Sequence, residues 1–137
     1  MNLNVSIREV YPHPIEKVWE TIATQHGLKA WLMENDFEPC VGHQCRFRFC
    51  DPTNRDQATL VYVTVLEMTP PHTMVWSWRN EHEPEPSRVT FQLREVSGGT
   101  ELHLTHTGPI SRGLFHDLQD GWPKKVASLQ KTLTGEY

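Results

Sequence analysis

Hydrophobic and polar residues alternate along most of the chain, as they do in strands that bury one face. Residues 3–11 begin this pattern, with Leu3, Val5 and Ile7 on one side and polar residues on the other. The same period of two recurs in the ranges 44–50, 58–68, 73–79, 88–96 and 101–107. In 58–68 both faces are largely apolar, so the alternation leaves open which face is inside. The pattern predicts a first strand and then five or more strands in an antiparallel meander.

Two kinds of turn separate neighbouring strands of this meander. Residues 51–56, DPTNRD, are rich in turn-forming Pro, Asn and Asp. The pair Gly98–Gly99 is typical of a tight hairpin.

Three other segments have the spacing of helices. Ile15, Val18, Trp19 and Ile22 recur at three and four residues, which places them on one helical stripe. A second short helix is expected after Gln25, burying Leu28, Trp31 and Leu32. The segment 113–133 is expected to form a long final helix, with a break or kink near Gly121–Pro123 because proline lacks an amide hydrogen. Its apolar stripe comprises Leu114, Leu118, Trp122, Val126, Leu129 and Leu133.

The order of these elements predicts an α+β fold in one domain, residues 1–137. An antiparallel sheet with one apolar face needs a cover, and the final helix supplies the matching stripe. We therefore expect a curved sheet wrapped around the long C-terminal helix, with two short helices after the first strand. Aromatic residues at this contact suggest a hollow between sheet and helix.

Composition and charge narrow the functional classes. The 137 residues carry 13 Lys and Arg against 17 Asp and Glu, a net charge of −4, which argues against nucleic-acid binding. Every apolar run is too short to span a bilayer, so no membrane partner is expected. The first residues, MNLNVSIREV, lack the basic and apolar parts of a signal peptide, so the expected location is the cytoplasm.

Cys40, Cys45 and Cys50 are spaced by five residues, and His43 lies nearby. Structural zinc sites generally use closer cysteine pairs, and Cys45 and Cys50 would point to opposite faces of one strand. We therefore expect free thiols and no metal rather than a zinc site.

Motifs of known catalytic chemistry are absent from the sequence. It has no Ser-His-Asp order, no glycine loop for phosphate and no HExxH helix, so no catalytic residue and no cofactor is assigned. Glu67 is the best candidate for an enzymatic base if it faces a cavity, because burial would raise the pKa of its carboxyl group.

The sequence resembles the SRPBCC or START-like superfamily, in the branch named after the C-terminal domain of the activator of heat-shock protein 90 ATPase. The resemblance rests on five pieces in order across nearly the whole chain. They are IREVYPHPIEKVWETIATQHGLKAWL, VGHQCRFRF, VLEMTPPHTMVWSW, VTFQLREVSGGTELHLTHTG and GWPKKVASLQKTL. This resemblance implies a helix-grip fold with an apolar cavity. Many relatives have two aromatics near Trp31 and a second glycine after Gly42, so the identity of a ligand does not carry over.

We expect the cavity to be lined by residues that strand parity and helical spacing turn inward. His106 shares a face with Leu102 and Leu104, and it either orients a polar group of the ligand or is satisfied by protein partners. The candidate ligand-binding residues are Trp31, Phe47, Phe49, Trp76, Trp78, Phe91, Leu104, His106 and Trp122.

Three functions remain in order of preference. The first is a binding module for a small hydrophobic or aromatic molecule. The second is a cyclase- or hydrolase-like enzyme that uses the same cavity with His106 or Glu67. The third is a regulator of heat-shock protein 90, which we disfavour because the activators have a separate N-terminal domain and this chain begins at the first strand. We expect no stimulation of that ATPase by the protein alone.

Overall fold

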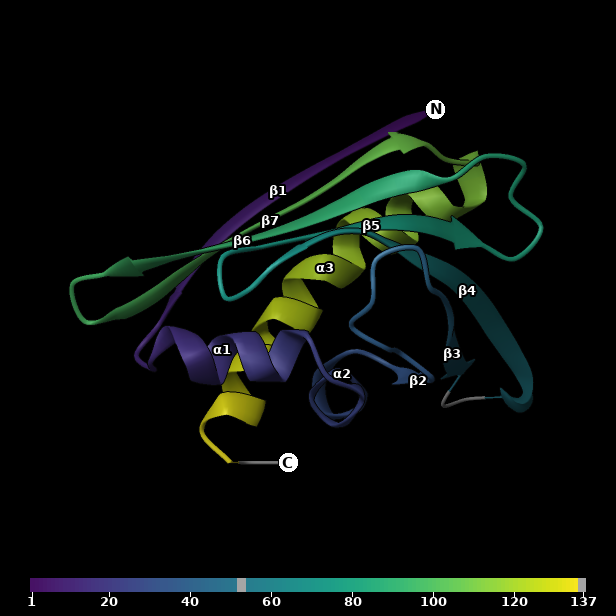
Figure 1. Cartoon of the computed structure of the whole chain (residues 1–137). Coiled ribbons are helices and arrows are strands. Elements are labelled where there is room, and N and C mark those ends of the chain that lie inside the picture. Colours follow the sequence, from purple (N-terminus) through teal and green to yellow (C-terminus); the bar gives the residue numbers. More distant parts are fainter. Residues whose placement is uncertain (52–53, 136–137) are drawn as a thin grey trace.

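A computed structural model describes the backbone of residues 1–51 and 54–135, and the side chains of all of these except 49–51 and 54–58. Its secondary structure follows the predicted order of a strand, two short helices, a meander of strands and a long helix (Figure 1). The elements are β1 (Asn2–Tyr11), α1 (Ile15–Ile22), α2 (Gln25–Trp31), β2 (Glu34–Asn35), β3 (Gln44–Asp51), β4 (Asn54–Thr69), β5 (Thr73–Asn80), β6 (Ser87–Val96), β7 (Gly99–Pro109) and α3 (Arg112–Leu133).

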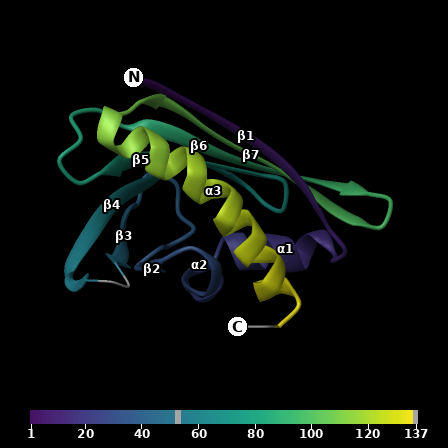
Figure 2. The ribbon, with the colours of Figure 1, turned by 180° about the vertical axis from the view of Figure 1, so that it is seen from behind.

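The strands form one seven-stranded sheet in the order β1-β7-β6-β5-β4-β3-β2, and every neighbouring pair is antiparallel. The sheet curves around α3, which crosses its concave side, while α1 and α2 lie beneath one end (Figure 2). The predicted α+β helix-grip architecture is therefore confirmed. Among the described residues, no helix has the length and apolar character that a bilayer span requires.

Two details of the strands differ from the prediction. The short β2 was not expected, because two residues are too few to show a period. Strand β3 reaches Asp51 and β4 begins at Asn54, so both strands extend into the range 51–56 predicted as a turn. Residues 52–53 lie outside the described residues. Backbone pairing between the two strands thus overrides the turn preference of the flanking residues.

The structure settles which side of β4 is inside. The side chains of Val61, Val63 and Val65 are buried on the face of the sheet that is turned toward α3. A register shift between Val65 and Glu67 marks a β-bulge, which changes the alternation of side chains. Glu67 is exposed, opposite Val75 on the outer face, so it does not face the space under α3.

An aromatic cluster fills the space where α2 meets the sheet. The ring centroids of Trp76 and Phe91 are 4.7 Å apart, and those of Trp31 and Phe91 are 6.5 Å apart. Phe47 and Phe37 add rings at 5.4 Å and 5.8 Å from Trp76. The tilted and edge-to-face geometries are those that aromatic rings prefer in cores. We call this cluster the packed end of the helix–sheet space.

The helix α3 runs as one element from Arg112 to Leu133 with Pro123 inside it, so of the break or kink expected near Gly121–Pro123 the break does not occur. Proline removes one amide donor, and the remaining hydrogen bonds and the buried second half keep the helix continuous. That second half is buried through Val126, Leu129 and Leu133, and the hydroxyl of Tyr11 donates to the carbonyl of Val126 at 3.1 Å. Its first half, before Trp122, has no fully buried residue.

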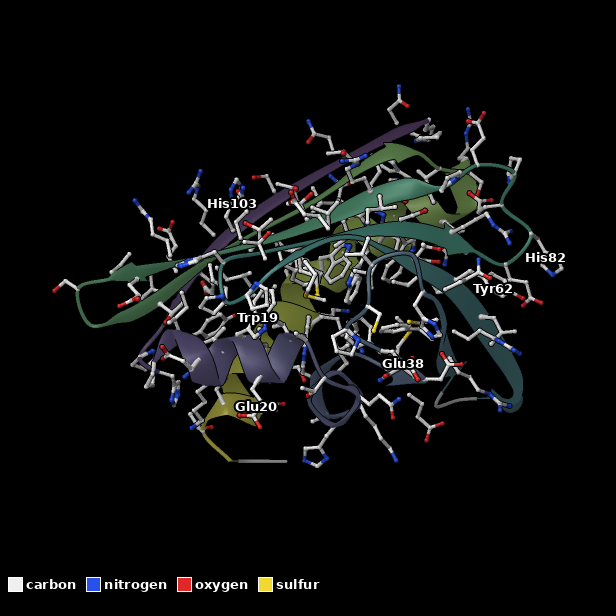
Figure 3. The ribbon with its side chains drawn as sticks, viewed as in Figure 1. Trp19, Glu20, Glu38, Tyr62, His82 and His103 are labelled. Atoms are coloured by element: carbon white, nitrogen blue, oxygen red, sulfur yellow. The ribbon has the colours of Figure 1, made fainter. Side chains whose placement is uncertain are left out.

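The short helices close the other side of the core. Ile15, Val18 and Ile22 are buried as the stripe predicts. Trp19 is partly buried and lies between α1 and the sheet (Figure 3). The indole of Trp31 donates to the carbonyl of Thr21 at 3.1 Å, which fixes α2 against α1.

Candidate ligand-binding pocket

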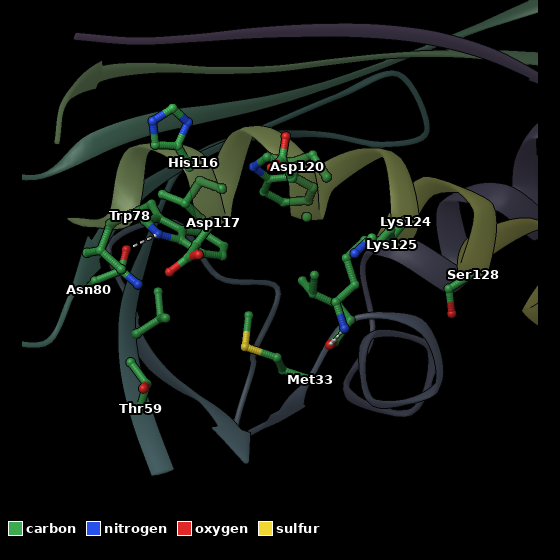
Figure 4. Close-up of a pocket in the computed structure, with 16 residues that line it drawn as sticks. Met33, Thr59, Trp78, Asn80, His116, Asp117, Asp120, Lys124, Lys125 and Ser128 are labelled. Atoms are coloured by element: carbon green, nitrogen blue, oxygen red, sulfur yellow. Dashed lines mark hydrogen bonds between the residues drawn. The ribbon is translucent and has the colours of Figure 1, made fainter. Parts of the chain in front are cut away.

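A half-open pocket lies between the first half of α3, strands β4 and β5, and the chain that follows α2 (Figure 4). Its volume is about 720 Å³, within the range of sites for small molecules. We call this region the open end of the helix–sheet space. The lining residues are Leu32, Met33, Thr59, Val61, Trp78, Asn80, Leu114, His116, Asp117, Leu118, Asp120, Gly121, Trp122, Lys124, Lys125 and Ser128.

The part of α3 that lines the pocket has a glycine, Gly121, near its middle. A Cβ built on Gly121 would meet no atom within 4 Å. Leu118 and Leu114, one and two turns earlier, are only partly buried. Further along α3, Val126 and Leu129 are buried against the sheet.

Two indoles form an apolar wall of the pocket. Trp78 comes from β5 and Trp122 from α3, and their ring centroids are 5.6 Å apart. Their exposed fractions are only 3% each, so each presents one small part of its ring to the pocket. Both indoles donate a hydrogen bond: Trp78 to Asn80, which also lines the pocket, and Trp122 to His106, which lies behind the wall.

The indole of Trp122 is fixed by a chain of hydrogen bonds behind the wall. Its Nε1–H donates to Nδ1 of His106 at 2.9 Å. His106 Nε2 and the hydroxyl of Ser87 are 2.6 Å apart, and that hydroxyl donates to the carbonyl of Trp78 at 3.1 Å. Since the hydroxyl proton is used on the carbonyl, His106 must donate from Nε2. His106 is therefore a neutral imidazole with its proton on Nε2.

The surroundings of His106 oppose its protonation. Burial lowers the pKa of His106 from 6.5 to about 3. A second ring proton, on Nδ1, would also point at the N–H of Trp122, which can only donate. Both ring nitrogens are used by protein partners, so His106 has no free position for a ligand.

The structure separates the nine sequence-predicted site residues into three groups. Trp78 and Trp122 line the pocket. Phe49 lies outside the described side chains. The other six are buried in the core away from the pocket lining: Trp31, Phe47, Trp76, Phe91, Leu104 and His106.

The pocket also contains polar residues that the sequence analysis missed. Asn80 is two residues after Trp78 on the same face of β5, so the alternation that selected Trp76 and Trp78 would also have found it. Lys125 lies on α3, where its ammonium donates to the carbonyl of Leu32 at 3.0 Å, and burial lowers the pKa of this amine. Nothing in the sequence distinguishes Lys125 from an exposed helical lysine.

The other candidate groups lie away from the pocket. Cys40 is exposed and Cys45 is buried, and the side chain of Cys50 lies outside the described residues. Within the described part of the chain, no three His, Cys, Asp or Glu side chains are grouped as a metal site would require. His103 lies on the outer face of the sheet, where it pairs with the hydroxyl of Ser6 at 3.0 Å (Figure 3).

Comparisons with known proteins agree with this architecture. The family model described as "Activator of Hsp90 ATPase homolog 1-like protein" matches residues 12–134. Curated proteins give no significant match. Protein MLL2253 from Mesorhizobium loti is 29% identical, with a TM-score of 0.81 and 98% of each chain covered.

Two solved structures at lower identity share the fold. Protein CV1439 from Chromobacterium violaceum is 18% identical, with a TM-score of 0.82 over 98% of this chain and 97% of that one. DynU16, a protein in the dynemicin biosynthetic locus, is 19% identical, with a TM-score of 0.82 over 96% of this chain and 47% of that one.

Proposed function

The chain belongs to the activator of Hsp90 ATPase homolog 1-like family within the SRPBCC superfamily, and we propose that it binds a small apolar or aromatic molecule at the open end of the helix–sheet space. The observation that carries this proposal is a pocket of about 720 Å³ whose apolar wall is two indoles held in fixed orientations. Preformed pockets with apolar walls and few polar groups are typical of small-molecule sites.

The fixed indoles favour flat, ring-containing ligands. Trp78 and Trp122 lose little conformational freedom on binding, because hydrogen bonds already hold both rings. A rigid aromatic surface gains contact with a planar ligand at a low entropic cost. Leu32, Met33 and Val61 are further apolar residues of the lining.

The enzymatic alternative gains no residue from the structure. It depended on His106 or Glu67 acting within the cavity. Both nitrogens of His106 are occupied behind the wall, and Glu67 is exposed on the outer face of the sheet. We therefore prefer binding to catalysis.

A steric plug tests the proposal directly. Gly121→Leu should place a side chain in the pocket without a clash, because a Cβ at this position meets no atom within 4 Å. We expect the Kd for the aromatic dye anilinonaphthalene sulfonate, measured by dye emission, to rise at least about tenfold. An added side chain in a binding site typically costs 1.4 kcal/mol or more.

Gly113→Leu is the matched control, because Gly113 is also on α3 with open space around its Cβ position but outside the pocket lining. Its dye affinity should equal that of the original protein. A folded Gly121→Leu protein that binds the dye as tightly as the original would contradict the proposed site. Native mass spectrometry of freshly purified protein should then identify any co-purified molecule.

A further inference from the structure

The pocket has one deeply buried polar side chain among its described lining residues. Asn80 is 6% exposed, whereas His116, Asp117, Asp120 and Lys124 are exposed residues of α3. Lys125 and Ser128 are partly buried. The carboxylates and the exposed lysine can be solvated at the rim, so Asn80 is the polar group that a ligand would meet in the interior.

The orientation of the Asn80 amide follows from its neighbour. The indole of Trp78 can only donate, and its Nε1 lies 2.7 Å from the oxygen Oδ1 of Asn80. The amide oxygen is therefore turned toward Trp78 and the amide nitrogen away from it. Figure 4 shows this nitrogen facing the pocket, on the side opposite Lys125.

The amide nitrogen of Asn80 can donate two hydrogen bonds. No hydrogen bond from Nδ2 of Asn80 occurs among the described residues. A donor left unpaired when a ligand displaces water costs free energy, and a ligand oxygen placed there recovers it. Asn80 lies beside the indole of Trp78, so a ligand ring in contact with the exposed edge of that indole lies next to this nitrogen.

We propose that the ligand is an aromatic molecule with a carbonyl or carboxylate oxygen, and that Nδ2 of Asn80 donates a hydrogen bond to this oxygen. This inference rests on the proposed function and adds the chemical class of the ligand. It assigns the orienting role to Asn80, whereas His106 acts only by holding the ring of Trp122. Aromatic molecules whose only polar groups are donors should bind less well, because two donors would meet at the amide.

The test uses two ligands of nearly the same shape. Acetylnaphthalene carries a carbonyl oxygen, and isopropylnaphthalene replaces it with a methyl group. Their affinities are measured by displacement of anilinonaphthalene sulfonate from the original protein and from Asn80→Leu. We expect acetylnaphthalene to bind more tightly than isopropylnaphthalene in the original protein. The ratio of the two affinities should be about tenfold larger in the original protein than in Asn80→Leu, which is the effect of one well-placed hydrogen bond. Naphthoate, measured in parallel, distinguishes a carboxylate from a neutral carbonyl as the preferred form of the acceptor.

Gln92→Leu is the matched control, since it makes the same chemical change at an exposed position of β6. Its affinity ratio should equal that of the original protein. An equal ratio in Asn80→Leu, with both ligands still excluded by Gly121→Leu, would overturn the role of Asn80 but leave the proposed function intact. If Gly121→Leu leaves the affinity for both ligands unchanged, the proposed function is contradicted instead.

A second measurement covers the case in which Asn80→Leu fails to fold, since it leaves the N–H of Trp78 unpaired. In the original protein labelled with nitrogen-15 asparagine, acetylnaphthalene should move the side-chain amide protons of Asn80 downfield. Isopropylnaphthalene should cause no downfield shift of these amide protons. Equal shifts with both ligands would overturn the proposal.

Discussion

The two ends of the space between α3 and the sheet both contain tryptophan side chains from β5, but they are packed in opposite ways. At the packed end, Trp76 and Phe91 are fully buried with ring centroids 4.7 Å apart. At the open end, Trp78 and Trp122 line a pocket of about 720 Å³. The difference shows that aromatic residues on a concave sheet do not by themselves indicate a cavity. A cavity forms only where the element opposite the aromatic residues supplies too few side chains to pack against them.

The facing elements differ in the volume that they supply. The packed end receives Trp31 from α2 and Phe37 from the chain after β2, and their rings reach the rings of the sheet. The open end receives the turn of α3 around Gly121, which has no side chain to fill the space. Close packing stabilises the first end, and missing volume makes the second available to a ligand.

The largest effect should come from removing a ring at the packed end. Phe91→Ala removes a fully buried ring between Trp31 and Trp76, and we expect a loss of about 3–5 kcal/mol in the free energy of unfolding. Phe115→Ala, on the partly exposed first half of α3, should lose about 1 kcal/mol. Urea denaturation measures both, and equal losses would show that the two ends do not differ in packing.

The pH dependence of stability tests the hydrogen-bond chain behind the open end. The pKa of His106 is lowered by burial from 6.5 to about 3, so between these values the unfolded chain binds a proton that the folded chain does not. The free energy of unfolding therefore falls as the pH is lowered below about 6.5, by up to about 1.4 kcal/mol per pH unit. Above about pH 6.5, where His106 is neutral in both the folded and the unfolded chain, none of this stability is lost.

His106→Gln isolates this contribution, because the variant lacks the titrating ring while all other ionisable groups remain. Between pH 6 and pH 4 we expect the original protein to lose about 2 kcal/mol more than the variant. Urea denaturation at several pH values measures the difference. Parallel pH profiles would mean that His106 is protonated in the folded protein.

Strand parity predicted the fold well because the sheet buries one face almost without exception. The alternation along residues 88–96 places Val89, Phe91 and Leu93 inside, as the structure does. It became ambiguous only in β4, where the bulge after Val65 changes which residues face inward. Local sequence cannot show a bulge of this kind, because it depends on the register with β5.

The pocket was harder to predict, because parity identifies inward residues but not what they meet. Trp76 and Trp78 have the same sequence signal, yet one is packed against Phe91 and the other lines the pocket. Their difference is set by contacts over long sequence distances, with α2 at one position and α3 at the other. The one local signal that remained was Gly121, a residue without a side chain that directly precedes Trp122 of the apolar stripe in the final helix.

The smallest effect should be a gain in stability at Gly121. Gly121→Ala removes the backbone freedom of glycine in a helix, and the added methyl group meets no atom within 4 Å. We expect the free energy of unfolding to rise by about 0.5–1 kcal/mol. Gly27→Ala should have the opposite sign, since a Cβ at Gly27 would clash with the backbone of Thr21 where α1 and α2 touch. The melting temperatures of Gly121→Ala and Gly27→Ala measure the effect of the same substitution at the open pocket and at the contact between α1 and α2. A loss of stability in Gly121→Ala would mean that α3 lies closer to the sheet than an open pocket allows.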